Sequence, residues 1–365
     1  MSRDDTLSSH TSPAPEEPAF LFARSGTRYE VLRPLTTEHN ELLARRRFQG
    51  GPSGLVRIKR LVAPCNPKLR QRLLDEVRLA MRLHHPAISP VYLLTMHEGV
   101  PHVVMEYVEG FSLETLLSFA AVRDRPLSTA FALYVGAELA DALHHAHTLA
   151  DDAGRPLGIV HRGVNPERIR VGHGGEVKLT DFGEAWSRLA HRLRTSPWVL
   201  RGDIAYASPE YTRSESVDAR ADIFSLGLVL LELLTQRHPL DSEEMDALTQ
   251  QEPEELLGEW VGRVRSEERS WLPAAQLVAR LQRLGPEHVE RAAQGLPEAL
   301  KALLHKALRQ DPTERFQTAA ELRDALRHQL APSGPYGREE AAREIHQAAE
   351  EASLRSESAE VLEQV

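Results

Sequence analysis

The chain has 365 residues, with 44 Lys and Arg against 53 Asp and Glu, which gives a formal net charge of −9. This acidic balance disfavours a nucleic-acid-binding protein, and a hydrophobic fraction of 41% excludes a wholly disordered chain. The single cysteine, Cys65, excludes an intramolecular disulfide, and no apolar run approaches the ~20 residues of a membrane helix or resembles a signal peptide. We therefore expect a cytoplasmic protein without membrane insertion.

The predicted elements fall into a strand-rich part followed by a helix-rich part. Residues 1–27 are rich in Ser, Thr, Pro and charge and predict a flexible leader. Alternating apolar residues then predict strands at Tyr29–Leu32, Leu55–Leu61, Val91–Thr95 and His102–Tyr107. One helical pattern, Pro67–Leu83, lies between the second and third of these strands. From Leu113 the periodicity is mostly helical, with amphipathic segments at Thr129–Leu149, Ala219–Thr235, Glu298–Ala307 and Ala319–Leu330.

The end of the chain has a composition of its own. After the breaker sequence at residues 331–335, the last 28 residues carry 3 Arg against 8 Glu, a net charge of −5. An apolar stripe with 4-3-4 spacing consists of Ala341, Ile345, Ala348 and Ala352. The stripe is shorter than a secure coiled coil, and alanine buries little area. We expect residues 331–365 to form a solvated acidic helix, with docking to a partner as the alternative.

An ordered set of motifs runs through the chain. It begins with Val56-Arg57-Ile58-Lys59, followed by Glu76 in the next predicted helix, His161-Arg162-Gly163 and Asp181-Phe182-Gly183. This order and spacing resemble a protein kinase, closest to the bacterial Ser/Thr type, over roughly Tyr29 to Leu330. Downstream, Ser208-Pro209-Glu210 stands where kinases carry Ala-Pro-Glu, residues 222–227 resemble the buried helix of the larger lobe, and Arg315 resembles the arginine that pairs with Glu210.

The resemblance implies an α+β, two-lobed protein-kinase-like fold. The N-lobe, about residues 28–107, would be a small antiparallel β-sheet with one αC-type helix. The larger, helical C-lobe would span about residues 111–330, before the tail at 331–365.

The resemblance also implies roles for several residues. Lys59 would hold phosphates and pair with Glu76, and Asp181 would chelate magnesium. A lobe-bridging ion pair of Lys59 and Glu76 without any ligand is the alternative. The remaining nucleotide-site positions that the chain retains are Met105, Glu106 and Val108.

Two departures from the family pattern lie in the catalytic loop. The aspartate that orients the acceptor hydroxyl is replaced by Gly163, so we predict that the general base is absent. Five residues later, the asparagine that would hold a second magnesium ion is replaced by Arg168, a cation that repels the metal.

Two further departures concern the nucleotide itself. The region where a glycine-rich loop would lie, Leu35–Leu42, contains no glycine and includes Glu38 and Glu41, so we expect it to cradle phosphate poorly. The positions that sandwich adenine are Arg57 and Arg170. Because strand residues at i and i+2 share a face, Arg57 should lie on the same face as Lys59 and obstruct adenine. The alternative is that both arginines turn outward and stack on the base.

Minor signals receive mostly structural interpretations. Asp203 replaces the threonine that usually accompanies the catalytic aspartate, and Thr195 and Ser196 are candidate phosphorylation sites. His144 and His147 could share a helix face, but no recognisable zinc spacing accompanies them. Gly172-His173-Gly174-Gly175 predicts a hairpin turn.

The sequence thus predicts a pseudokinase that regulates or scaffolds signalling proteins, with lost or impaired phosphoryl transfer, weak or absent ATP binding and no required cofactor. Its partners would be proteins, such as an active kinase, and not nucleic acid. The alternative is a divergent active Ser/Thr kinase that uses ATP and magnesium, with Asp203 or Glu167 orienting the acceptor. A third hypothesis is a sensor in which Arg57 and Arg170 clamp a small anion.

Overall fold

The computed structural model describes residues 20–24, 26–36, 40–48, 51–61, 67–182, 203–213, 215–241, 245 and 274–363. Contacts divide the chain into two compact units. The first consists of Met1–Val62 and Leu93–Tyr107, and the second of Ala63–Tyr92 and Val108–Val365. Each unit has its own hydrophobic cluster.

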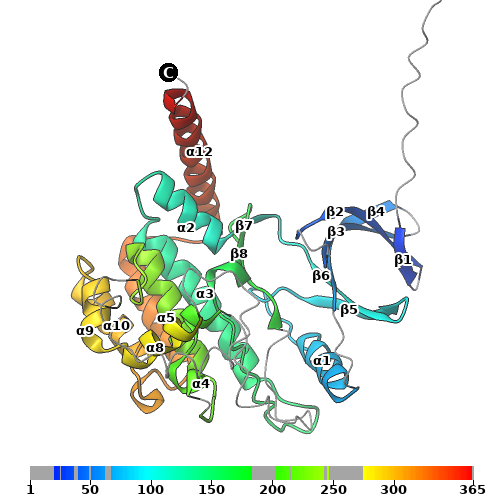
Figure 1. The fold of residues 1–365 in the computed structure, drawn as a ribbon, viewed down its shortest axis with the longest axis horizontal. Helices are drawn as coiled ribbons and strands as arrows, with labels where there is room; N and C mark the ends of the chain where they lie inside the picture. The colour runs from blue at the N-terminus through cyan, green and yellow to red at the C-terminus, as the bar shows by residue number, and fades with distance from the viewer. Residues whose placement is uncertain are drawn as a thin grey trace, which may run out of the picture. The chain divides into compact units, whose positions relative to one another are not determined.

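The first unit is built on a six-stranded sheet with the order β1-β2-β3-β4-β6-β5 (Figure 1). Its strands are β1 (Phe20–Arg24), β2 (Thr27–Pro34), β3 (Glu41–Phe48), β4 (Gly51–Arg60), β5 (Val91–His97) and β6 (Val100–Glu106). The pairs from β1 to β4, and β4 with β6, are antiparallel.

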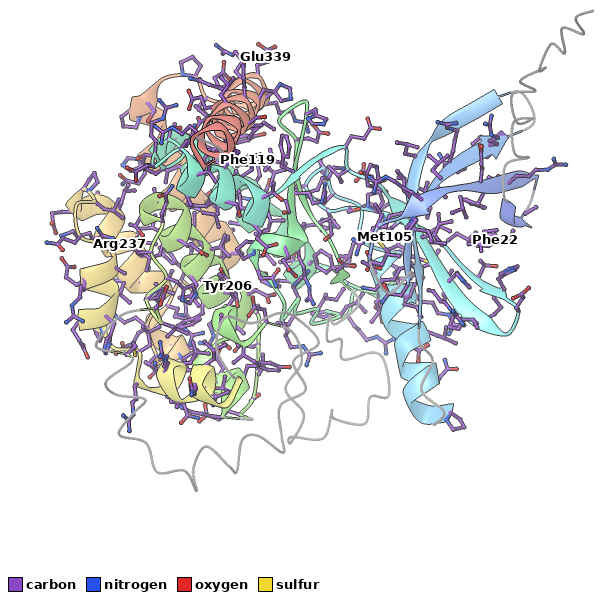
Figure 2. All side chains as sticks on the ribbon, turned by 45° about the horizontal axis from the view of Figure 1, so that its top comes forward. Phe22, Met105, Phe119, Tyr206, Arg237 and Glu339 are labelled. Atoms are coloured by element: carbon purple, nitrogen blue, oxygen red, sulfur yellow. The ribbon has the colours of Figure 1, made fainter. Side chains whose placement is uncertain are left out.

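Alternation along these strands separates two faces of the sheet. One face carries the buried cluster of this unit, which consists of Tyr29, Ala44, Val56, Ile58 and Val104. Val56 and Ile58 on β4 flank Arg57, which therefore points to the opposite face together with Lys59. Figure 2 labels Phe22 and Met105 in this unit.

Two strands of the six-stranded sheet were not predicted from the sequence. β1 lies inside the expected flexible leader, so that expectation is wrong for Phe20–Arg24. Phe22 packs 4.9 Å from the Tyr29 ring, which anchors this short strand in the core. β3 was missed because three consecutive arginines, residues 45–47, hide its alternation.

The second unit is mostly helical. Its helices are α1 (Pro67–Ala80), α2 (Leu113–Val122), α3 (Thr129–Thr148), α4 (Pro209–Thr212), α5 (Arg220–Thr235), α8 (Ala274–Arg283), α9 (Pro286–Ala292), α10 (Glu298–Ala307), α11 (Ala319–Leu330) and α12 (Arg338–Glu363). A small antiparallel sheet contains β7 (Gly110–Ser112), β8 (Ile169–Gly172) and β9 (Val177–Leu179). The hairpin predicted at residues 172–175 is confirmed, and Gly175 supplies its positive φ of 76°.

Helices α3 and α5 form the centre of the second core. Twelve residues of α5 are buried, which is typical of a helix that is apolar on all sides. Gly136 on α3 allows the close approach of Leu230, since a Cβ there would lie 2.5 Å from its Cδ2 atom. The predicted ranges of α10 and α11 are confirmed without change, and those of α3 and α5 to within one residue.

The solvated tail helix is a wrong prediction. In α12 the residues Ala341, Ile345 and Ala348 are fully buried, and Ala352 is 4% exposed. The helix contacts α2, beside which it lies in Figure 1. Small alanine side chains bury little area each, but they let two helices approach closely. Among the described helices, none combines the length and apolar composition that a membrane span requires.

Candidate functional site

Glu41 binds two of the three cations of β4 in the first unit, Arg57 and Lys59. β3 and β4 pair so that Glu41 lies opposite Lys59. The Arg57 guanidinium donates to both carboxylate oxygens of Glu41, at 2.7 Å from Nε and 2.8 Å from Nη2. Lys59 Nζ lies 3.2 Å from Glu41 Oε1. The Arg57 and Glu41 side chains are only 17% and 13% exposed, so this pair is partly desolvated.

This ion-pair cluster confirms that Arg57 and Lys59 share a face of the sheet. It also gives Glu41 a role that the sequence does not predict, because the position of Glu41 in the chain indicates only a charge that repels phosphate. The strand register would have been needed to find it. The expected partner of Lys59, Glu76, belongs to α1, and its side chain lies outside the described residues.

The segment that would meet adenine begins at the end of β6. Met105 lies opposite Arg57 in the β4–β6 register and is buried, and Glu106 ends the strand. Val108 follows as a buried residue of the second unit.

Arg170 binds the backbone of the segment between β6 and β7 and of Gly110, the first residue of β7. Its Nη2 donates to the Gly110 carbonyl at 2.7 Å, and its Nε donates to the Val108 carbonyl at 3.3 Å. Arg170 also pairs with Ser112 in the β7–β8 register. An arginine turned outward to stack on a base would not make these two bonds. Arg170 therefore fastens the connecting segment to β8.

The catalytic-loop region of the second unit brings Gly163 and Arg168 together. The Arg168 Nη1 lies 3.5 Å from the Gly163 carbonyl oxygen. A Cβ added at Gly163 would lie 1.9 Å from Nη1 and 3.1 Å from Cζ of Arg168. Gly163 is not among the glycines with positive φ, so backbone strain does not explain the glycine. The space for a larger side chain is occupied by a guanidinium.

A buried carboxylate holds the start of this loop. Asp222, near the start of α5, accepts hydrogen bonds from the backbone N–H groups of His161 and Arg162 at 2.8 and 2.7 Å. It also contacts His147 Nε2 at 2.8 Å, which confirms the structural interpretation of that histidine. Burial alone would raise the pKa of Asp222. The hydrogen bond to His147, the electrostatic attraction of His147 and His161, and the N–H of Arg162 together hold this pKa below its usual value.

Asp181 directly follows Thr180, which connects the end of β9 to the catalytic-loop region. Thr180 N donates to the Arg168 carbonyl at 2.9 Å, and Thr180 Oγ1 lies 3.2 Å from an Asp181 carboxylate oxygen. Asp181 and Arg162 both have a φ of 59°, a left-handed conformation that is uncommon for non-glycine residues. Phe182 packs edge-on against His161, with ring centroids 4.5 Å apart. Gly183 lies outside the described residues.

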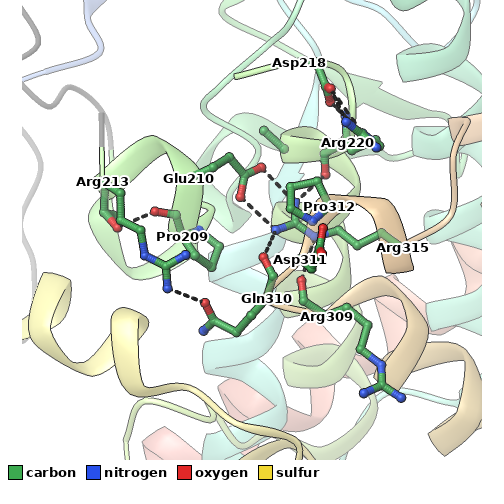
Figure 3. A network of polar contacts seen from close by, with 12 residues as sticks. Pro209, Glu210, Arg213, Asp218, Arg220, Arg309, Gln310, Asp311, Pro312 and Arg315 are labelled. Atoms are coloured by element: carbon green, nitrogen blue, oxygen red, sulfur yellow. Dashed lines mark hydrogen bonds and ion pairs between the residues drawn. The ribbon is translucent and has the colours of Figure 1, made fainter. Parts of the chain in front are cut away.

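The predicted pair of Glu210 and Arg315 is confirmed (Figure 3). Arg315 donates through Nη1 and Nη2 to the two carboxylate oxygens of Glu210, at 2.8 and 2.7 Å. Both side chains are buried, at 0% and 4% exposure. Three backbone carbonyls complete the coordination of the guanidinium, those of Arg220, Arg309 and Gln310. The full complement of acceptors explains how this charge is tolerated inside the unit.

The candidate replacements for a catalytic carboxylate have different surroundings. Asp203 accepts a hydrogen bond from the N–H of Ala205 at 3.0 Å and caps the short helix η3 (Ile204–Tyr206). Glu167 lies in η1 (Pro166–Arg168), and partial burial together with the charge of Glu114 raises its pKa. Thr195 and Ser196 fall outside the described residues. Within the described part of the chain, no group of three or more His, Cys, Asp or Glu side chains is arranged for a metal ion.

Comparison with known proteins agrees with this geometry. The family model for the protein kinase domain matches residues 53–330. The tyrosine-protein kinase MasK of Myxococcus xanthus is 33% identical over 282 residues, which cover 74% of this chain and 38% of MasK. The serine/threonine-protein kinase PknB of Mycolicibacterium smegmatis is 32% identical over 289 residues, which cover 77% of this chain and 40% of PknB. The chain thus spans about two fifths of the length of these relatives.

The likeness to a solved structure shows the fold. The crystal structure of the Mycobacterium tuberculosis PknI kinase domain has a TM-score of 0.55 and 24% identity, and the match covers 85% of this chain and 99% of that domain. The family match begins at residue 53, after β1, β2, β3 and the glycine-free segment. With the ordered motifs and the buried Glu210–Arg315 pair, these comparisons show that the chain belongs to the protein kinase family, in its bacterial eukaryotic-like branch.

Proposed function

We propose that this protein is a pseudokinase, a member of the kinase family that regulates or scaffolds other signalling proteins and has lost phosphoryl transfer. The observation that carries the proposal is the position of Arg168, whose guanidinium lies where a side chain at residue 163 would begin. A general base must lie within hydrogen-bond reach of the hydroxyl proton that it accepts. Gly163 has no side chain, and a cation fills the neighbouring space.

The same arginine opposes metal binding. Magnesium prefers hard oxygen ligands in an octahedral arrangement. Asp181 offers such a carboxylate, but the second position of the family pattern holds the Arg168 guanidinium, which is a donor only and carries a positive charge. The residues therefore fit at most one of the two metal ions that a protein kinase uses.

The surroundings of Lys59 argue for weak nucleotide binding. Lys59 already lies 3.2 Å from Glu41, which also binds Arg57. A phosphate would have to compete with that carboxylate and would approach its negative charge. Arg170 in turn occupies backbone carbonyls of the segment that would contact adenine. Glu41 also neutralises Arg57, which weakens the hypothesis of an anion sensor made by the two arginines.

The nucleotide part of the proposal is tested by thermal unfolding of the full chain. A ligand at 100 times its Kd stabilises a protein by ~2.7 kcal/mol. We expect the melting temperature to stay unchanged with millimolar ATP, with or without magnesium. A magnesium-dependent rise in melting temperature would reject weak nucleotide binding, and GTP serves as the control for non-specific nucleotide effects.

An active kinase is the second candidate function, and the contacts that hold the catalytic-loop backbone favour it. Asp222 holds the backbone of His161 and Arg162, and Asp181 keeps its positive φ. Loss of a general base alone costs about 10²–10⁴ in rate, so residual transfer would survive that single change. Glu167, with its raised pKa, would then be the better replacement, because Asp203 is engaged as a helix cap.

A further inference from the structure

The tail helix α12 is a docked part of the second unit, although the kinase family match ends at residue 330. Its apolar stripe, defined by Ala341, Ile345, Ala348 and Ala352, is buried. At its start the helix touches the β8–β9 turn, where a Cβ at Gly175 would lie 1.9 Å from the Arg338 carbonyl oxygen. Tyr134 on α3 donates to the Gly175 carbonyl at 3.0 Å and fixes the same turn.

Two glutamates of α12 form a polar seam with the connection between α2 and α3. Glu351 accepts from Arg125 at 2.8 and 3.0 Å and from Arg123 at 3.3 Å. Glu344 accepts from the Ser128 backbone N–H at 2.5 Å and from the Ser128 hydroxyl at 2.7 Å. The two glutamates are seven residues apart, which is about two helical turns, so both face the connection.

Glu344 acts as the anion at the N-terminus of the 20-residue helix α3. Ser128 is the N-cap of this helix, and its Oγ also accepts from the Phe131 N–H at 3.0 Å. The first N–H groups of a helix lack intrahelical partners, and the helix dipole favours negative charge there. The Tyr336 hydroxyl donates to the same carboxylate at 2.6 Å. The tail therefore places the Glu344 carboxylate at the N-terminus of α3, where the helix dipole stabilises negative charge.

We propose that Ser128 is a phosphorylation site and that its phosphorylation releases α12. A phosphoserine carries nearly two negative charges and three acceptor oxygens. At residue 128 it would accept from N–H groups of the first turn of α3, such as that of Phe131, and would repel the Glu344 carboxylate at close range. The phosphate on Ser128 would thus replace the Glu344 carboxylate as the anion at the N-terminus of α3.

The surroundings of Ser128 suit both the modification and its effect. The residue is exposed, and Arg123 and Arg125 precede it by five and three residues. The Arg125 side chain is 57% exposed, so it has room to turn from Glu351 toward a phosphate at residue 128. That movement would weaken the contact of Glu351 with the α2–α3 connection. Release of α12 would uncover the apolar stripe and the face of α2 that it covers.

The modification is an ordinary phosphoryl transfer from a second protein kinase with a bound nucleoside triphosphate. The Ser128 oxygen forms a bond to the γ-phosphorus, and the bond between that phosphorus and the β,γ-bridging oxygen breaks. Nucleoside diphosphate leaves, and the hydroxyl proton passes to the base of that second kinase. The step does not depend on any activity of this chain, so its test is separate from that of the proposed function.

The test compares amide exchange of residues 341–352 in the full-length protein and its variants. Ser128→Asp adds charge but keeps N-cap quality, and Ser128→Asn is the neutral control because Asn, Asp and Ser cap equally well. We expect exchange to rise about tenfold in Ser128→Asp and in protein with phosphoserine incorporated at 128, and not in Ser128→Asn. Thr129→Asp places the same charge one residue further along and should leave exchange unchanged.

Ser128→Asp combined with Glu344→Gln should restore wild-type exchange, because the repelling carboxylate is gone. Equal exchange in Ser128→Asp and Ser128→Asn would overturn the release mechanism. Peptide mapping of the protein isolated from its native cells should contain phosphoserine at 128. Complete coverage of that peptide in the unmodified form alone, across growth conditions, would overturn the assignment of the modification.

Discussion

The guanidinium of Arg168 and the missing side chain of Gly163 occupy one space in the catalytic loop. A Cβ at residue 163 would lie 1.9 Å from Nη1 of Arg168, and that nitrogen is 3.5 Å from the Gly163 carbonyl oxygen. The two departures from the kinase pattern are therefore one structural change. The glycine leaves room, and the arginine five residues later fills it.

A double-mutant cycle tests this relationship. Gly163→Ala should destabilise the wild-type protein more than it destabilises the Arg168→Ala background, with a coupling of about 0.5–1 kcal/mol, because the flexible guanidinium must move aside. The free energy of unfolding in urea measures both costs. Additive effects within error would show that the two positions are independent.

The arginines of the nucleotide region make a second prediction. Arg57→Ala combined with Arg170→Leu should restore measurable ATP affinity, because the first change removes the guanidinium that is predicted to obstruct adenine and the second frees the carbonyls of Val108 and Gly110. A rise in melting temperature with ATP is the readout. Arg60→Ala, at an exposed end of β4, is the matched control and should have no effect. An unchanged double variant would instead implicate the glycine-free segment between β2 and β3.

Asp222 predicts a pH-dependent contribution to stability. Asp222→Asn should cost about 3 kcal/mol at pH 7, because His147 and two backbone N–H groups lose a buried carboxylate. The folded pKa is lowered, so this contribution is present above the unfolded pKa and is lost as the pH falls through the folded value.

The difference between wild type and Asp222→Asn should therefore stay constant from about pH 7 to 5 and shrink below about pH 4. Urea unfolding at several pH values measures it. Asp152→Asn is the control, since that side chain is 97% exposed. A difference that grows as the pH falls would contradict the assigned direction of the pKa shift.

A comparison of two glycine variants distinguishes the cost of backbone strain from the effect of losing the tail contact. Gly154 and Gly175 have φ values of 75° and 76°, but only at Gly175 would a Cβ collide with the tail, at 1.9 Å from the Arg338 carbonyl. Gly154→Ala should cost about 1–2 kcal/mol through strain alone. Gly175→Ala should cost more and should also speed protease cleavage at residues 331–337. Equal stability and equal cleavage in the two variants would show that α12 does not depend on this contact.

Much of the fold was predictable because its signals are local. The helical spacing of α10 and α11 marks their ends, and the motifs around Lys59, His161, Asp181 and Glu210 fixed the family. The burial of α12 could not be predicted, because an alanine stripe is compatible with solvent unless the matching surface of α2 is known. β1 was hidden by its short length, and β3 by its run of arginines.

In the candidate site, residue types were predictable but partners were not. The sequence places Arg57 and Lys59 on one face, yet only the β3–β4 register brings Glu41 opposite Lys59 and within reach of both cations. The charge of Arg168 predicts a barrier to metal. That it also fills the space beside Gly163 depends on the path of its side chain, which no spacing rule specifies.

The most direct test of the proposed function is transfer of label from γ-labelled ATP. The full-length protein is incubated with magnesium, alone and with a basic peptide substrate, beside the Lys59→Met variant. We expect that the label on the wild-type protein and on the peptide does not exceed the label seen with Lys59→Met. Incorporation that Lys59→Met abolishes would show an active kinase and contradict the proposal.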